Sequence, residues 1–152
     1  MAVEILDETH RFRQADTVRL ALEALLAEEG SHDREVSLVL VDDATIAARN
    51  ARDRGVEGAT DVLSYPTAEP DDIGFPQVPH LGDIFISLDT AERQAAAHGH
   101  DVMREVLVLA AHGLTHLRGH DHADDEAWAP FRRAERRVLE LADAAAAGEP
   151  PA

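Results

Sequence analysis

The distribution of apolar and polar positions along the chain predicts several short strands separated by helices. Short apolar runs bounded by polar or turn-forming residues are typical of buried strands. Four such runs occur, and Pro66 ends the third because proline has no N–H for a strand ladder. The predicted strands are residues 3–6, 36–41, 61–65 and 81–87.

Helices are predicted where apolar residues recur every three or four positions. Their starts are marked by aspartates that can cap a helix, such as Asp101, and their ends by glycines such as Gly119. The predicted helices are residues 17–28, 44–54, 89–97, 102–118 and 130–144. Helix 102–118 is apolar around much of its circumference, so we expect it to lie buried at the centre of the fold.

This mixture of elements predicts an α+β fold, in which a small mixed sheet of about four strands packs with helices. The central helix 102–118 would carry the metal ligands described below. A chain of 152 residues is about the size of one compact domain. We expect that domain to span residues 1–147, followed by a flexible C-terminal tail at residues 148–152.

Residues 67–80 contain three prolines and one glycine and predict no regular structure. A connection of this length is often a functional loop or a lid over a site. It can equally be a variable surface connection. The pattern alone favours neither interpretation.

Composition narrows the chemistry that the chain can perform. With no cysteine, it has neither disulfides nor thiolate ligands, so any metal must be held by His, Asp or Glu. The net charge of −16 should repel polyanions at long range. Every basic side chain is arginine, which favours two-pronged contacts with phosphate.

The chain shows neither a secretory signal nor an apolar stretch of the roughly 20 residues that a membrane span requires. We therefore expect a cytoplasmic location and no membrane partner.

The most informative segment is residues 112–122, which carries four of the nine histidines. His112 and His116 lie four positions apart, so on a helix they project from the same face. Gly119 can turn the chain back and bring His122 to the same point. This is the ligand spacing of the metzincin proteases. Three imidazoles with an open fourth position predict one catalytic zinc ion per chain.

His120 offers an alternative third ligand, because it continues the spacing of His112 and His116 by another four residues. That arrangement would require the helix to run through Gly119, and glycine is a poor interior helix residue but a good terminator. We therefore expect His122 to complete the triad and His120 to point elsewhere. Asp121 could orient a ligand imidazole or could be an exposed turn residue.

Gly113 stands where the zinc proteases have the glutamate that serves as general base, which disfavours peptide hydrolysis by that route. The remaining chemistry is activation of water or of a phosphoryl oxygen. Arg54 is the candidate to stabilise the developing negative charge, although a solvated position at a helix end is the alternative. We expect Arg52 and Arg54, with Arg49, to form a basic patch facing the metal cleft.

Three segments together resemble the YbeY family, bacterial zinc-dependent endoribonucleases of ribosomal RNA maturation and ribosome quality control. The resemblance covers most of residues 36–140. Its most specific part is residues 112–122, HGLTHLRGHDH, similar to the family's H-G-x-L-H-L-x-G-Y-D-H. The other parts are residues 50–54, NARDR, with residues 60–66, TDVLSYP, and residues 81–84, LGDI.

By position, the resemblance implies that His112, His116 and His122 bind zinc and that Arg54 and His112 serve catalysis. It implies cleavage of single-stranded RNA, with 16S rRNA 3′-end processing as the task and the ribosome or a ribosomal protein as partner. The chain departs from the family pattern at three positions, Thr115 for Leu, His120 for Tyr and Tyr65 for Phe.

Two other functions remain open at this point. One is a ribosome assembly or binding factor in which the zinc is structural, which three ligands and an open position disfavour. The other is a zinc hydrolase of a small or peptide substrate, which the acidic composition would tolerate.

Overall fold

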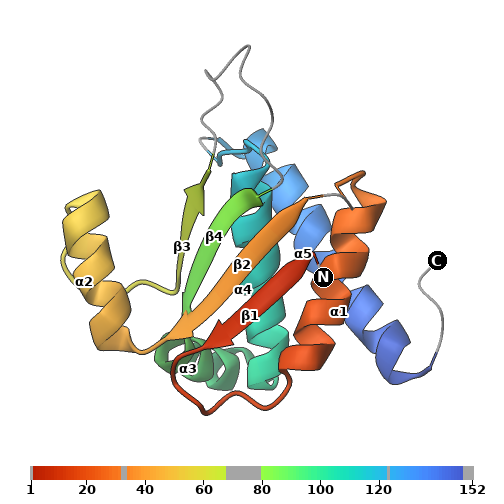
Figure 1. Cartoon of the computed structure of the whole chain (residues 1–152), viewed down its shortest axis with the longest axis horizontal. Helices are drawn as coiled ribbons and strands as arrows, with labels where there is room; N and C mark the ends of the chain where they lie inside the picture. The colour runs from red at the N-terminus through yellow and green to blue at the C-terminus, as the bar shows by residue number, and fades with distance from the viewer. Residues whose placement is uncertain (1, 32–33, 68–79, 123, 149–152) are drawn as a thin grey trace.

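The fold is built on one mixed sheet of four strands (Figure 1). The structure is a computed structural model that describes residues 2–31, 34–67, 80–122 and 124–148. The strand order is β1-β2-β4-β3, with β1, β2 and β4 parallel and β3 antiparallel to β4. The strands are β1 (Val3–Asp7), β2 (Glu35–Val41), β3 (Val62–Pro66) and β4 (His80–Ser87).

Five α-helices and one short 3₁₀ helix surround this sheet and confirm the predicted α+β class. They are α1 (Ala15–Glu28), α2 (Asp43–Arg54), α3 (Leu88–His98), α4 (Val102–Leu117), η1 (Glu126–Trp128) and α5 (Ala129–Ala146). Each boundary of the strands and α-helices lies within two residues of its predicted position, whereas the 3₁₀ helix η1 was not predicted. Patterns of apolar residues were sufficient here because each element buries one well-defined face.

The sheet separates two apolar layers. Leu38 and Ile84 belong to the main core, together with residues of α1, α4 and α5. Their neighbours along the strands, Val39 and Phe85, face the other way and pack with Ile46 of α2. Figure 1 shows α2 and α4 on different sides of the sheet. The central parallel strands are therefore covered on both faces, which explains why they read as continuous apolar runs.

Helix α4 lies at the centre of the main core, as its apolar circumference predicted. Val106, Leu107, Ala110 and Ala111 are each fully buried. Gly113 packs directly on the sheet, and a Cβ atom there would lie 2.8 Å from Ile84 Cγ2 and 3.0 Å from Ser64 Oγ. The close approach of α4 to β3 and β4 thus depends on the missing side chain.

The start of α4 is fixed by polar contacts. The carboxylate of Asp101 accepts a hydrogen bond from the Arg104 backbone N–H and so caps the helix. Glu105 in the first turn is buried, and its Oε1 lies 2.9 Å from His98 Nδ1 and 2.7 Å from His100 Nε2. These contacts tie the connection between α3 and α4 to the buried end of the helix.

The loop or lid predicted at residues 67–80 falls largely on residues 68–79, which lie outside the described residues. The same holds for residues 149–152 of the expected tail, so the boundary after residue 147 stays a prediction. Among the described residues, none of the helices has the length and apolar character to cross a membrane.

We predict that Gly113→Ala destabilises the protein. In an open helix this change gains about 1 kcal/mol of stability. Here the new methyl group would collide with Ile84 and Ser64, and such overpacking costs about 1–3 kcal/mol. Urea unfolding should show a lower midpoint with an unchanged slope. Ala51→Gly, on the exposed face of α2, is the control that measures how much an exchange between alanine and glycine changes stability when no packing is affected. A Gly113→Ala variant at least as stable as the wild type would contradict the close packing.

Candidate active site

Three histidines from the end of α4 and the turn after it converge on one point. The candidate ligand nitrogens of His112, His116 and His122 all lie within 4.8 Å of one another. The ring centroids are 4.8 Å apart for His112 and His116, 5.3 Å for His112 and His122, and 5.0 Å for His116 and His122. This triad is a possible metal site, and it is the one that the spacing predicted.

The turn at Gly119 brings His122 back to the helix. Gly119 adopts φ of 95°, a left-handed conformation that favours glycine. Its N–H donates to the carbonyl of His116, and the N–H of His120 donates to the carbonyl of Thr115. This double hydrogen bond is the Schellman arrangement that ends a helix. The helix therefore stops where the sequence predicted.

His120 serves the triad through its backbone. Its carbonyl oxygen lies 3.1 Å from Nδ1 of His116 and can accept a hydrogen bond from that nitrogen. Such a bond leaves Nε2 of His116 as the free ligand atom and fixes the ring orientation. The His120 side chain lines a different groove. Asp121 accepts a hydrogen bond from the His122 backbone N–H, which fits the role of a turn residue.

Two aromatic side chains hold the imidazole rings. His122 stacks on Trp128 of η1, with ring centroids 4.2 Å apart and an interplanar angle of 12°. Phe131 of α5 contacts all three histidine rings, at centroid distances of 4.7 to 5.2 Å. The sequence pattern did not connect either aromatic residue with the metal site.

Burial favours the neutral, metal-binding form of His112 and His116. Desolvation, helped by the neighbouring His116 and His122, lowers the pKa of His112 to about 4. Desolvation also lowers the pKa of His116. Glu135 of α5 lies 3.8 Å from Nδ1 of His112, too far for a hydrogen bond, and burial raises the pKa of its carboxyl group. Protons therefore compete weakly with a cation for His112 near neutral pH.

The triad opens into a pocket of about 520 Å³. Arg54, the last residue of α2, lines this pocket together with the three histidines and residues 60–64 and Pro66. Its Nη2 donates to the carbonyl of Ser64 at 2.7 Å, and its guanidinium lies 5.2 Å from the Tyr65 ring centroid. These contacts hold the side chain beside the triad and leave further N–H groups of its fork free for an anion.

The expected basic patch contributes only Arg54 to this pocket. Arg52 instead pairs with Asp53, with Nε 2.8 Å from Oδ1. Arg49 lies over the ring of Phe85, 3.8 Å from its centroid. The Tyr65 hydroxyl donates to Asp53 at 2.6 Å, so the end of α2 is bound to β3. Arg49 and Arg52 are therefore engaged in contacts of their own and do not line the metal pocket with Arg54.

Asp61 is a pocket residue that sequence reasoning quoted only as part of a motif. It lines the same pocket as His112, and its charge raises the pKa of that histidine, although desolvation outweighs it. Its Oδ2 accepts a hydrogen bond from Gln94 at 3.3 Å. Among the described residues that line this pocket, Asp61 carries the single carboxylate. No periodicity could have indicated this, because the aspartate reaches the site through the position of β3.

The sequence is similar to known proteins over most of its length. A family model described as Endoribonuclease YbeY matches residues 3–143 of the chain. The chain belongs to the YbeY endoribonuclease family. The endoribonuclease YbeY of Thermus thermophilus is 52% identical over 124 residues, which cover 82% of this chain and 88% of that protein. That of Deinococcus radiodurans is 54% identical over 109 residues, which cover 72% and 69%.

A solved structure agrees with the fold. A solution structure of a protein from Thermotoga maritima superposes with a TM-score of 0.68 at 25% sequence identity. The match covers 98% of this chain and 94% of that one. The family assignment and the α+β architecture are thus supported by independent comparisons of sequence and structure.

The departures from the YbeY motif are accommodated locally. The hydroxyl of Thr115 is buried and donates to the carbonyl of Ala111 at 2.8 Å, so the polar group has a partner inside the helix. The side chain of His120 points away from the triad. Tyr65 keeps its ring edge-on to Phe85 and gains the hydroxyl contact with Asp53. None of the three residues belongs to the triad of candidate ligands.

A second group of possible ligands lies at the opposite end of α4. It comprises His98, His100 and Glu105. Both imidazoles lie within hydrogen-bond distance of the same carboxylate oxygen, which satisfies the buried glutamate directly. We therefore interpret this group as the structural anchor of the connection between α3 and α4.

We predict that the metal-free protein loses stability as the pH falls from about 6.5 to about 4. In the unfolded chain His112 binds a proton near pH 6.5, whereas in the folded protein its pKa is about 4. Between these values the unfolded state binds more protons, so the free energy of unfolding rises with pH and then levels off. Urea unfolding of the metal-free protein across this range measures the effect.

The matched variants isolate this histidine. His112→Asn should weaken the pH dependence of unfolding, because the titrating group is gone. His10→Asn, in an exposed turn after β1, should keep the wild-type dependence. Identical curves for His112→Asn and the wild type would show that the buried triad does not control acid stability.

Proposed function

We propose that this chain is a zinc-dependent endoribonuclease that cleaves single-stranded RNA in ribosomal RNA maturation, including 16S rRNA 3′-end processing, and in ribosome quality control. The observation that carries the proposal is the shared pocket, where three imidazoles and one guanidinium meet. Membership of the YbeY family supports the same activity.

The donor set fits zinc. Three neutral imidazoles and a pocket open to solvent are typical of catalytic zinc, whereas structural sites are closed by four protein ligands. The lowered pKa of His112 and the contact of His116 Nδ1 with the His120 carbonyl favour metal binding through these rings. We infer one Zn²⁺ per chain, held by His112, His116 and His122.

Arg54 is proposed to stabilise the charge that develops on the phosphoryl oxygens. When bound, zinc supplies Lewis-acid polarisation and lowers the pKa of a water ligand to about 7. The guanidinium of Arg54 lies in the same pocket and is steadied by the Ser64 carbonyl, so it can receive an anionic group without rearranging. His112 contributes to catalysis as a ligand.

Asp61 is the proposed proton acceptor. A hydrolase needs a group that takes a proton from the attacking water. Gly113 cannot do this, and its Cα faces Ile84 and Ser64 with no room for a longer side chain. Asp61 lines the same pocket as the triad, which supports this role.

The net charge of −16 argues that naked RNA binds weakly, since phosphate contacts supply much of the affinity for nucleic acid. A ribosomal protein or the ribosome itself would then deliver the substrate. The expected place of action is the cytoplasm, where ribosomal RNA is processed. This reasoning favours cleavage within an assembly over cleavage of free RNA.

We predict that Arg54→Ala retains zinc and the native fold yet loses RNA cleavage by about 10²–10³-fold, the usual cost of removing one oxyanion-stabilising donor. Arg54→Lys should recover part of the rate, because lysine keeps the charge but not the planar fork. Cleavage rates on unstructured RNA, with zinc measured by elemental analysis, give the comparison. Arg52→Ala is the control, because that arginine pairs with Asp53 and lies outside the pocket.

His112→Ala tests the metal separately. We expect this variant to lose both zinc and cleavage, since two imidazoles bind the ion much less well than three. Structured RNA should be cut poorly by the wild type. If zinc-free protein cleaves RNA and Arg54→Ala does so at the wild-type rate, the proposal is wrong. A zinc-retaining wild type that never cleaves RNA, alone or with ribosomes, would favour the assembly-factor alternative.

A further inference from the structure

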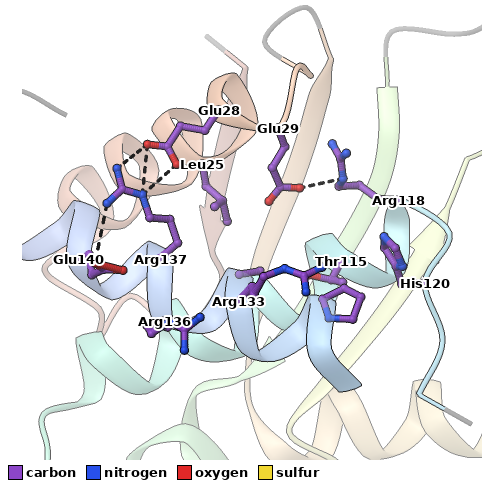
Figure 2. Close-up of a pocket in the computed structure, with 12 residues that line it drawn as sticks. Leu25, Glu28, Glu29, Thr115, Arg118, His120, Arg133, Arg136, Arg137 and Glu140 are labelled. Atoms are coloured by element: carbon purple, nitrogen blue, oxygen red, sulfur yellow. Dashed lines mark hydrogen bonds and ion pairs between the residues drawn. The ribbon is translucent and has the colours of Figure 1, made fainter. Parts of the chain in front are cut away.

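Helix α5 concentrates arginine on an otherwise acidic chain. Four of the 14 basic residues fall within six positions, Arg132, Arg133, Arg136 and Arg137. The last three line a groove of about 460 Å³ between α5, the end of α1 and the end of α4 (Figure 2). Arg118 and His120, from the end of α4 and the turn after it, also line the groove, as do Glu28, Glu29 and Glu140.

Two of these arginines already pair with glutamates at the end of α1, on the opposite side of the groove. Arg137 forms a two-pronged contact with Glu28, at distances of 2.6 to 3.2 Å. Arg118 pairs with Glu29 at 2.8 Å and also donates to the Ser31 hydroxyl at 2.6 Å. These pairs fix the shape of the groove, because they bind the end of α1 to α5 and to the end of α4.

The other two arginines remain available. Arg133 and Arg136 are exposed and, among the described residues, have neither a hydrogen bond nor an ion pair. Figure 2 shows both side chains extending from α5 without a dashed contact. A guanidinium offers five N–H donors in a plane that matches phosphate oxygens. The groove therefore presents two unused phosphate-binding groups on a protein whose net charge is −16.

The groove adjoins the metal pocket through a single turn of chain. His116 and His122 line the pocket, whereas Thr115, Arg118 and His120 line the groove. The His120 carbonyl contacts His116 while its side chain lies in the groove. The groove and the metal pocket therefore lie on either side of the same turn, which an RNA strand would cross to contact both sites.

We propose that this groove binds the backbone of single-stranded RNA next to the bond that is cut. The inference rests on the proposed endoribonuclease function. Arg133 and Arg136 contact phosphates, and the imidazole of His120 provides a face on which a base can stack. An acidic protein segment would match the two arginines equally well, but the turn that the groove shares with the metal pocket favours the substrate of that pocket, the nucleic acid.

Length dependence of cleavage tests the groove. Single-strand sites of OB folds span about 4–16 nucleotides, so we compare an RNA of about 4 nucleotides, chosen to occupy the metal pocket alone, with one of about 16, chosen to extend into the groove. Arg133→Ala/Arg136→Ala should raise KM about tenfold for the long RNA, leave kcat unchanged and leave the short RNA unaffected. The slope of log(kcat/KM) against log salt for the long RNA should fall by about 1.4, or about 0.7 for each lost phosphate contact.

Three controls make the result specific. Arg13→Ala/Arg93→Ala removes the same charge outside the groove and the metal pocket and should leave KM unchanged. Arg133→Lys/Arg136→Lys should retain most of the salt dependence, because the charge remains. Zinc content and the thermal midpoint of the groove variant should equal those of the wild type.

The possible outcomes separate this inference from the proposed function. A groove variant with wild-type KM on long RNA overturns the inference while leaving the nuclease intact. If the wild type cleaves no RNA, but anisotropy shows that it binds long RNA through Arg133 and Arg136, the groove survives and the proposed function fails. If the groove variant loses binding to polyglutamate but binds RNA with the affinity of the wild type, the groove is assigned to an acidic protein and the RNA proposal is overturned.

Discussion

The contact between α4 and the sheet at Gly113 determines where the chemistry of this protein can take place. Because no Cβ separates the helix from Ile84 and Ser64, the backbone of α4 lies directly on β3 and β4. His112, one residue earlier, therefore opens into a pocket that Ser64 also lines. Glu105 holds the other end of α4 through two imidazoles, so the helix is fixed along its length.

Several chain segments end at the pocket, and each end is held by a specific contact. Helix α4 stops at the Gly119 turn, which returns His122 to the helix. The end of α2 is bound to β3 through Asp53 and Tyr65, which leaves Arg54 at the rim. Trp128 packs on His122 from η1. Side chains on such rigid elements keep their geometry better than side chains on long loops.

Pairing, more than total charge, decides what the arginines can do. Arg52 and Arg137 are each bound to a neighbouring carboxylate and mainly hold structure together. Arg54 gives one N–H to a backbone carbonyl and keeps the rest of its fork, while Arg133 has no partner among the described residues. A chain of net charge −16 can thus still present guanidinium groups, unpaired among the described residues, in its pocket and its groove, where short-range contacts with phosphate outweigh the distant repulsion.

The sequence by itself determined the triad and the limits of the helices and strands. His112, His116 and His122 follow from the helical period and one glycine turn, both of which act over less than a dozen residues. Only the tertiary structure decided the strand order, the placement of Arg54 and Asp61 beside the triad, and the packing of Trp128 and Phe131 on its rings. These features depend on contacts between segments far apart in the chain, which local periodicity does not encode. The need for glycine at position 113 is also a tertiary effect, because Ile84 and Ser64 on the neighbouring strands leave no room for a Cβ atom.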